Sequence, residues 1–197
     1  AQSMPAVDIV NMAQEFKAGN RSIFSRQLQM AVEEAIKKGE QVILYLNRRG
    51  FASSVVCREC GYTMMCRKCN IALTYHKGQN VLKCHYCDYI VPNPKHCPNC
   101  GSQFIRHFGS GTQLVEEQVR KTWPYLQTVR MDMDTTQNKN AHQKILEIFA
   151  KGEAQILIGT QMITKGLDFP NVTVVGVIAA DITLNMPDYT ASERNFQ

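Results

Sequence analysis

The chain has 197 residues, of which 44% are hydrophobic, and its 22 Lys and Arg against 17 Asp and Glu give a formal net charge of +5. A chain of this length and composition can bury one core of ordinary size together with a small additional module. It contains no run of about eighteen apolar residues that would cross a membrane, and it begins without a signal-peptide pattern, so we expect a cytoplasmic protein that has no membrane partner.

The segment before the first cysteine predicts a helix followed by a buried strand. Between Ser25 and Lys38, apolar residues recur at helical spacing; Ser25 suits the N-cap and Gly39 suits a left-handed C-cap. The continuous apolar run 42–46 is typical of a strand that is covered on both faces. This strand runs directly into the basic pair Arg48 and Arg49.

All eight cysteines then occur as four C-x-x-C pairs within 44 residues. A two-residue gap lets both sulfurs of a tight turn reach one metal ion, and two such turns complete the closed tetrahedral site of structural zinc. The pattern therefore predicts two zinc ions. A disulfide framework is disfavoured because nothing else in the chain looks secreted, and a redox motif is disfavoured because it normally occurs once.

The gaps between the pairs indicate which cysteines share a metal. Five, fourteen and nine residues separate successive pairs, and only the gap of fourteen approaches the roughly fifteen to twenty that two facing turns usually need. The spacing favours an inner site nested in an outer one, although sequential pairing across five residues stays open. The inner site would comprise Cys66, Cys69, Cys84 and Cys87, and the outer site Cys57, Cys60, Cys97 and Cys100.

Positive charge is concentrated around the cysteines. From Tyr45 to Arg106 the formal charge is +7, and eight thiolates with two Zn²⁺ ions would bring it to about +3. Such a surface suits nucleic-acid phosphate, but basic residues can equally balance thiolates, so charge alone does not decide. We expect the four tyrosines of the region to form its small core, with base-stacking platforms as the alternative, and its three histidines to lie beside the zinc sites or at the surface. They are Tyr62, Tyr75, Tyr86 and Tyr89, and His76, His85 and His96.

After the cysteines, helices and buried strands alternate. Thr112 is expected to cap a helix that runs to about Lys121, and a second helix is expected at 141–150; strands are expected at 128–131, 155–159 and 172–178. This order predicts an α/β fold, with a parallel sheet and helices on both faces. We expect three parts: 1–51 as the first part of this fold, 52–107 as an inserted cysteine module, and 108–197 as the remainder.

Ligands of parallel sheets bind at the carboxyl ends of the strands. The loop after Ile158 combines Thr160, Gln161, Lys165, Gly166 and Asp168. Thr160 and Lys165 suit a sugar-phosphate backbone, Gly166 allows close approach of the main chain, and Asp168 can face a ribose or an arginine. Gly166 and Asp168 can equally be ordinary turn residues.

The runs ILIGTQMITKGLDFPNVTVVGVIAAD and PDYTASERNFQ resemble motif V and the approach to motif VI of superfamily 2 helicases. Together with LNRRGF, the cysteine turns that begin VCRECG, GSGTQLVEEQV and RMDMDTT, they make the chain similar to the PriA family of replication-restart DNA helicases from about Pro5 onward.

The resemblance implies a second RecA-like motor lobe with two nested structural zinc ions. It implies that the whole enzyme uses ATP and Mg²⁺ to move 3′ to 5′ on single-stranded DNA, binds stalled or abandoned forks and starts primosome assembly. The implied partners are single-stranded and forked DNA, the N-terminal helicase lobe, primosome proteins including the replicative helicase loader, and single-stranded DNA-binding protein. Thr160, Gln161, Lys165, Gly166 and Asp168 would couple DNA to nucleotide, and Arg48, Arg49 and Lys165 would face DNA.

The chain departs from a complete motor of this kind. It has no G-x-x-x-x-G-K-[ST] loop, no D-E-x-H-type segment, and it stops at Gln197 before the arginine-bearing motif VI, so we expect it to hydrolyse no ATP by itself. Asn11 replaces a usual acidic residue, and Thr190 replaces a common arginine, which puts any contact assigned to that position in doubt. Two rivals remain: a zinc-ribbon interaction module without motor ancestry, and a DNA translocase that does not separate strands.

Overall fold

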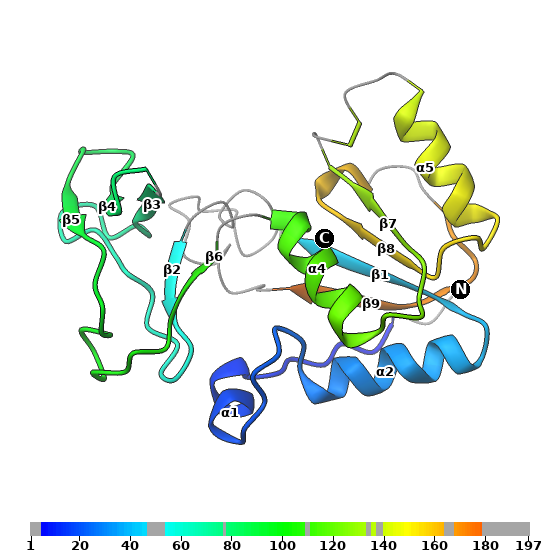
Figure 1. Cartoon of the computed structure of the whole chain (residues 1–197), viewed down its shortest axis with the longest axis horizontal. Coiled ribbons are helices and arrows are strands. Elements are labelled where there is room, and N and C mark those ends of the chain that lie inside the picture. Colours follow the sequence, from blue (N-terminus) through cyan, green and yellow to red (C-terminus); the bar gives the residue numbers. More distant parts are fainter. Residues whose placement is uncertain are drawn as a thin grey trace.

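The computed structural model describes residues 5–46, 54–76, 78–108, 111–132, 135–136, 140–163 and 168–178. Its larger sheet has four parallel strands in the order β7-β8-β1-β9. These strands are β1 (Gln41–Leu46), β7 (Thr128–Met131), β8 (Ile156–Gly159) and β9 (Val172–Ile178). We call this sheet and its helices the α/β lobe; Figure 1 shows it beside the smaller cysteine module.

Helices cover both faces of this sheet. Helices α2 (Arg26–Lys37) and α4 (Gly111–Thr122) pack against one core cluster, which includes Val42, Leu44 and Leu46 of β1. The alternate residues Ile43 and Tyr45 join a second cluster with α5 (Ala141–Ala150), on the opposite side of the sheet from α2 (Figure 1). Side chains of a strand point to alternate faces, so β1 contributes to both cores. The predicted α/β fold class is confirmed.

The predicted N-cap is right for α2 and wrong for α4. Ser25 caps α2 as predicted: its Oγ accepts a hydrogen bond from the Leu28 backbone N–H at 3.1 Å, and Gly39 follows with φ 76°. The predicted cap Thr112 is wrong, because this residue lies inside α4 rather than before it. Its hydroxyl donates instead to the carboxylate of Asp132, so tertiary contact takes the place of local capping.

A short helix near the start of the chain, α1 (Met12–Lys17), was not predicted. The Asn11 side chain caps it by accepting hydrogen bonds from the backbone N–H groups of Ala13 and Gln14, at 3.0 and 3.2 Å. Six residues are too few to display helical periodicity, and Phe16 is the one buried residue in this helix.

The cysteine module contains a five-stranded antiparallel sheet in the order β5-β4-β3-β2-β6. Its strands are β2 (Ser54–Cys57), β3 (Thr74–His76), β4 (Val81–Lys83), β5 (Ile90–Pro92) and β6 (Ile105–Phe108). Ser54 pairs with Phe108, so the chain enters and leaves the module side by side. The module has its own core, around Val55, Leu73 and Leu82. The domain boundaries predicted at 51/52 and 107/108 remain a prediction.

Within the described ranges, no helix is both long enough and apolar enough to span a membrane.

Candidate metal centres and strand-end site

The four cysteine turns share one backbone conformation. In each turn, the N–H of the residue after the second cysteine donates to the carbonyl of the first cysteine, and that residue has positive φ. Glycine adopts this conformation freely, and Asn and Asp tolerate it better than other residues. The N···O distances and φ angles are 2.9 Å and 76° for Gly61, 2.9 Å and 52° for Asn70, 3.1 Å and 55° for Asp88, and 2.8 Å and 75° for Gly101.

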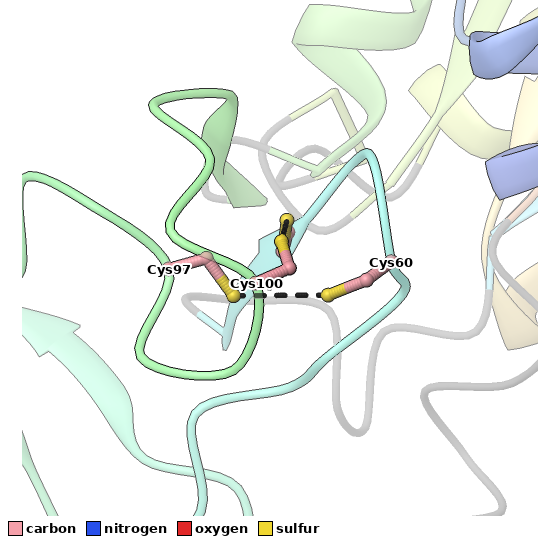
Figure 2. A group of neighbouring side chains, drawn as sticks. Cys60, Cys97 and Cys100 are labelled. Carbon is pink, nitrogen blue, oxygen red and sulfur yellow. Dashed lines mark hydrogen bonds between the residues drawn. The ribbon is translucent and has the colours of Figure 1, made fainter.

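The structure brings the cysteines together in two groups of four, and these are the nested groups that the gap lengths favoured. Within each group, all four Sγ atoms lie within 4.8 Å of one another. Figure 2 shows the outer group, in which Cys60 from the segment after β2 faces Cys97 and Cys100 from the segment before β6. The inner group likewise joins one turn before β3 to one turn after β4.

The sulfur geometry fits zinc. The Sγ–Sγ distances are 3.6 Å for Cys57–Cys100, 3.7 Å for Cys60–Cys97 and 3.6 Å for Cys66–Cys87. A tetrahedron with Zn–S bonds of about 2.3 Å has edges of about 3.8 Å, whereas a disulfide needs about 2.05 Å. The first cysteine of every pair is buried. When bound, each ion would supply a closed cross-link between two turns, with no open position for a substrate.

The protonation of the thiols also fits a bound cation. Burial raises the pKa of the Cys60 thiol, but hydrogen bonds from the Tyr62 backbone and the Asn99 side chain outweigh it and lower this pKa to about 6. In the inner group, the neighbouring Cys87, together with burial, raises the pKa of Cys69 to about 12. A bound cation would offset the repulsion between thiolates that raises the pKa of Cys69.

A second cluster of functional groups lies at the carboxyl ends of the parallel strands. Met131 pairs with Gly159, so Asp132 and Thr160, which follow them, are neighbours at this edge. Thr160 is buried at this edge. Asp168 is exposed and lies away from it, before the amino end of β9, where the ring of the next residue, Phe169, meets that of Phe149 with centroids 5.0 Å apart. A Cβ at Gly159 would lie 2.7 Å from Ile163 Cγ2 and 3.1 Å from the Met131 carbonyl oxygen, so the loop folds tightly over the strand end.

Of the other residues predicted for this site, the structure describes Gln161. Gln161 begins the 3-10 helix η1 (Gln161–Ile163). Arg48, Arg49, Lys165 and Gly166 lie outside the described residues, so their contacts remain predictions.

Sequence reasoning missed the role of Asp132. Its carboxylate accepts hydrogen bonds from the Thr112 hydroxyl and the Arg130 guanidinium, and from the Thr135 backbone N–H at 2.9 Å. Burial raises the pKa of this carboxyl, but these three partners outweigh burial and lower the pKa below its ordinary value. Arg130 also forms an ion pair with Glu116 of α4 at 3.1 Å. The signal available in the sequence was an acidic residue directly after the strand expected at 128–131.

The turn that begins at Asp132 reaches the loop after β8. The Thr136 hydroxyl donates to the Asp132 carbonyl at 2.6 Å and contacts the sulfur of Met162 at 3.7 Å. Contacts of Asp132 and Thr136 therefore connect the beginning of α4 to η1.

Two of the tyrosines of the cysteine module behave as predicted. Tyr75 and Tyr89 pack against its core, whereas Tyr62 and Tyr86 are exposed and the prediction for these two is wrong. Tyr86 occupies a middle position of the turn between Cys84 and Cys87. His85 and His96 are exposed, and His76 is partly buried with its ring centroid 5.9 Å from that of His85.

Comparisons with known proteins match both parts of the structure. Residues 66–92 match the family described as PriA DNA helicase Cys-rich region (CRR) domain, and residues 101–192 match the helicase conserved C-terminal domain. The chain is 54% identical to the replication restart protein PriA of Bacillus subtilis over 98% of its own length, and 49% identical to that of Synechocystis over 100%. It is 42% identical to that of Haemophilus influenzae over 86%. It spans 24%, 24% and 23% of these relatives.

Proposed function

Because this chain belongs to the PriA family of replication restart proteins, we propose that it is the second motor lobe of an ATP-dependent DNA helicase. The chain spans 24% of the length of the Bacillus subtilis relative and 24% of that from Synechocystis. The whole enzyme would move 3′ to 5′ on single-stranded DNA and bind stalled or abandoned forks. The observation that carries the proposal is the strand-end site, where Asp132 and Thr160 are neighbours at the carboxyl-end edge of a parallel sheet.

At this edge, residues of the loop after β8 would couple DNA contact to the state of the nucleotide. Lys165, Arg48 and Arg49 would bind phosphates of the DNA backbone, because a cationic side chain offsets the phosphate charge and displaces counterions. Thr160, Gln161, Gly166 and Asp168 would change position with the nucleotide. The Thr136 hydroxyl, which donates to the Asp132 carbonyl and contacts the Met162 sulfur, would support η1.

The two groups of four cysteines would each hold one Zn²⁺ as a structural ion. ATP and Mg²⁺ would bind between this lobe and the N-terminal helicase lobe, which would supply the phosphate-binding loop. Forked DNA, primosome proteins including the helicase loader, and single-stranded DNA-binding protein are the proposed partners. The proposed place of action is the cytoplasm, in keeping with the replication restart role named for the relatives.

A zinc-ribbon interaction module without motor ancestry is disfavoured. Such a module needs no second core, whereas this chain builds a four-stranded parallel sheet covered by helices on both faces.

The test is an ATPase and unwinding assay of the full-length protein on forked DNA with a single-stranded arm of either polarity. We expect DNA-stimulated hydrolysis and strand separation from the arm that permits 3′ to 5′ movement, and no hydrolysis by the 197-residue chain alone. Hydrolysis without strand separation would favour a translocase. Absence of DNA-stimulated hydrolysis from the full-length protein would overturn the proposal.

A further inference from the structure

The cysteine module touches the α/β lobe at a place distant from the covalent connections. The Arg58 side chain, in the turn between Cys57 and Cys60, donates hydrogen bonds to the carbonyl oxygens of Arg21 and Ser22 at 2.7 and 2.8 Å. These carbonyls lie in the segment between α1 and α2. A guanidinium that bridges two successive carbonyls uses its planar fork, which a lysine cannot reproduce.

Aromatic contacts surround this bridge. The rings of Phe16 on α1 and Phe104 of the module meet edge to face, with their centroids 5.1 Å apart. The Arg21 guanidinium lies 3.7 Å from the Phe16 centroid, and that of Arg58 lies 4.8 Å from it. Phe16 is 4% exposed although it belongs to no core cluster of the lobe. We call Phe16, Arg21, Arg58 and Phe104 the Phe16 clamp.

The clamp is connected to the main body of the lobe by polar contacts. Glu15 of α1 accepts hydrogen bonds from the Asn20 side chain at 2.7 Å and from the backbone N–H of Arg26 at 2.9 Å. Asn20 also donates to the Phe24 carbonyl at 2.8 Å, and Phe24 is part of the lobe core. A series of contacts therefore connects the outer cysteine group through α1 to the first turn of α2.

The two cysteine groups differ in this respect. Arg58 and Arg67 are equivalent in position, each being the residue after the first cysteine of its turn. Arg58 contacts the lobe, whereas Arg67 in the inner group is exposed. The inner group packs within the module's own core.

We propose that the Phe16 clamp fixes the orientation of the cysteine module, so that the module moves with this lobe as one body. The two neighbouring strands β2 and β6, by which the module joins the lobe, would alone act as a hinge. The Phe16 clamp is a third contact away from this hinge, and it stops the module from rotating. In this arrangement the outer cysteine group is the docking site, and the inner group is carried at the far end. The inference concerns rigidity and is independent of the proposed motor activity.

The test measures backbone ¹⁵N relaxation and hydrogen exchange on the zinc-loaded 197-residue chain, with Arg67→Ala as the matched control for Arg58→Ala. We expect one rotational correlation time for module and lobe in the unaltered chain and in Arg67→Ala. In Arg58→Ala the module should acquire a shorter correlation time than the lobe. Exchange of α1 amides should accelerate by about tenfold or more, since hydrogen bonds to a charged donor are lost.

A second variant, Phe104→Ala, changes the clamp outside the cysteine turns, and zinc content is measured for all variants. Separate correlation times in both clamp variants, with two zinc ions retained, would support the proposal. A common correlation time in either zinc-loaded variant would overturn it. Loss of zinc from the outer group alone would also overturn it, because the contact would then serve metal binding rather than docking.

Discussion

The residue after each cysteine pair lies at positive φ, and the sequence places Gly61, Asn70, Asp88 and Gly101 there. The C-x-x-C spacing predicted the metal ligands, but this fifth residue determines whether the turn closes without strain. It also donates to the carbonyl of the first cysteine, which holds both sulfurs of the pair on one side.

We predict that Asn70→Val weakens zinc binding by the inner group about tenfold, because a β-branched residue in the left-handed region costs about 1–2 kcal/mol. Asn70→Gly, the matched control, should bind as tightly as the unaltered chain. Competition with a chromogenic chelator measures both. Equal weakening by the two variants would mean that the Asn70 side chain acts by something other than its φ.

We expect substitutions of Lys165 and Asp168 to have different effects in the full-length protein. Lys165→Ala should weaken binding of single-stranded DNA and reduce its salt dependence by about one phosphate contact. Asp168→Ala should leave DNA affinity nearly unchanged and depress DNA-stimulated ATP hydrolysis, because phosphate repels a carboxylate. Affinity, hydrolysis and melting temperature are measured on the same preparations. Parallel losses of all three in both variants would indicate that the residues merely shape a turn.

Asp132 should stabilise the lobe in a pH-dependent way. Its pKa is lower in the folded chain than in the unfolded one, so its contribution is present above the unfolded pKa and disappears as the pH falls through the folded pKa. Asp132→Asn is expected to cost about 1–3 kcal/mol at pH 7, and the difference from the unaltered chain should vanish in acid. Denaturation followed by Trp123, the single tryptophan, reports this. A difference that does not depend on pH would exclude an ionic origin.

Among the secondary-structure elements, those of the lobe were predictable. The helical segments expected from the sequence correspond to α2, α4 and α5, and the expected strands correspond to β1, β7, β8 and β9. The strands of the cysteine module were not predicted, because they have three or four residues and the cysteine turns set their positions. Helix α1 depends on a contact with Phe104 that lies far along the chain, and Thr112 depends on Asp132 in the same way. At the strand-end site, the sequence indicated the loop after Ile158 but missed the role of Asp132.

Gly159 determines how η1 lies on the end of β8. Gly159→Ala should destabilise the lobe by about 1–3 kcal/mol, because the new Cβ would overlap Ile163 and crowd the Met131 carbonyl. Gly78→Ala is the control, since a Cβ there meets nothing within 4 Å. Thermal unfolding measures both. An unchanged melting temperature for Gly159→Ala would show that η1 can move away without cost.

Among the described residues, the two core clusters of the lobe, one on each face of its sheet, are separate from the core cluster of the cysteine module. Removal of zinc should therefore unfold residues 54–108 and leave the parallel sheet in place, because structural zinc contributes on the order of 10 kcal/mol to modules of this kind. Circular dichroism should retain most of its helical signal, and Trp123 should stay buried. One cooperative loss of both signals on chelation would contradict this division.

The position of the module between β1 and β7 also affects the order of folding. Strand β1 pairs with β8 and β9, so Val42 must meet Ile156 and Val174 across more than half of the chain. The hairpin of β3 and β4 pairs residues that are close in sequence, and it should form first, since short loops close faster than long ones. Once β2 and β6 are paired, the long insertion behaves as a short connection between β1 and α4. We therefore expect the supply of zinc to govern how quickly the parallel sheet of the lobe is assembled, although this sheet contains no metal ligand.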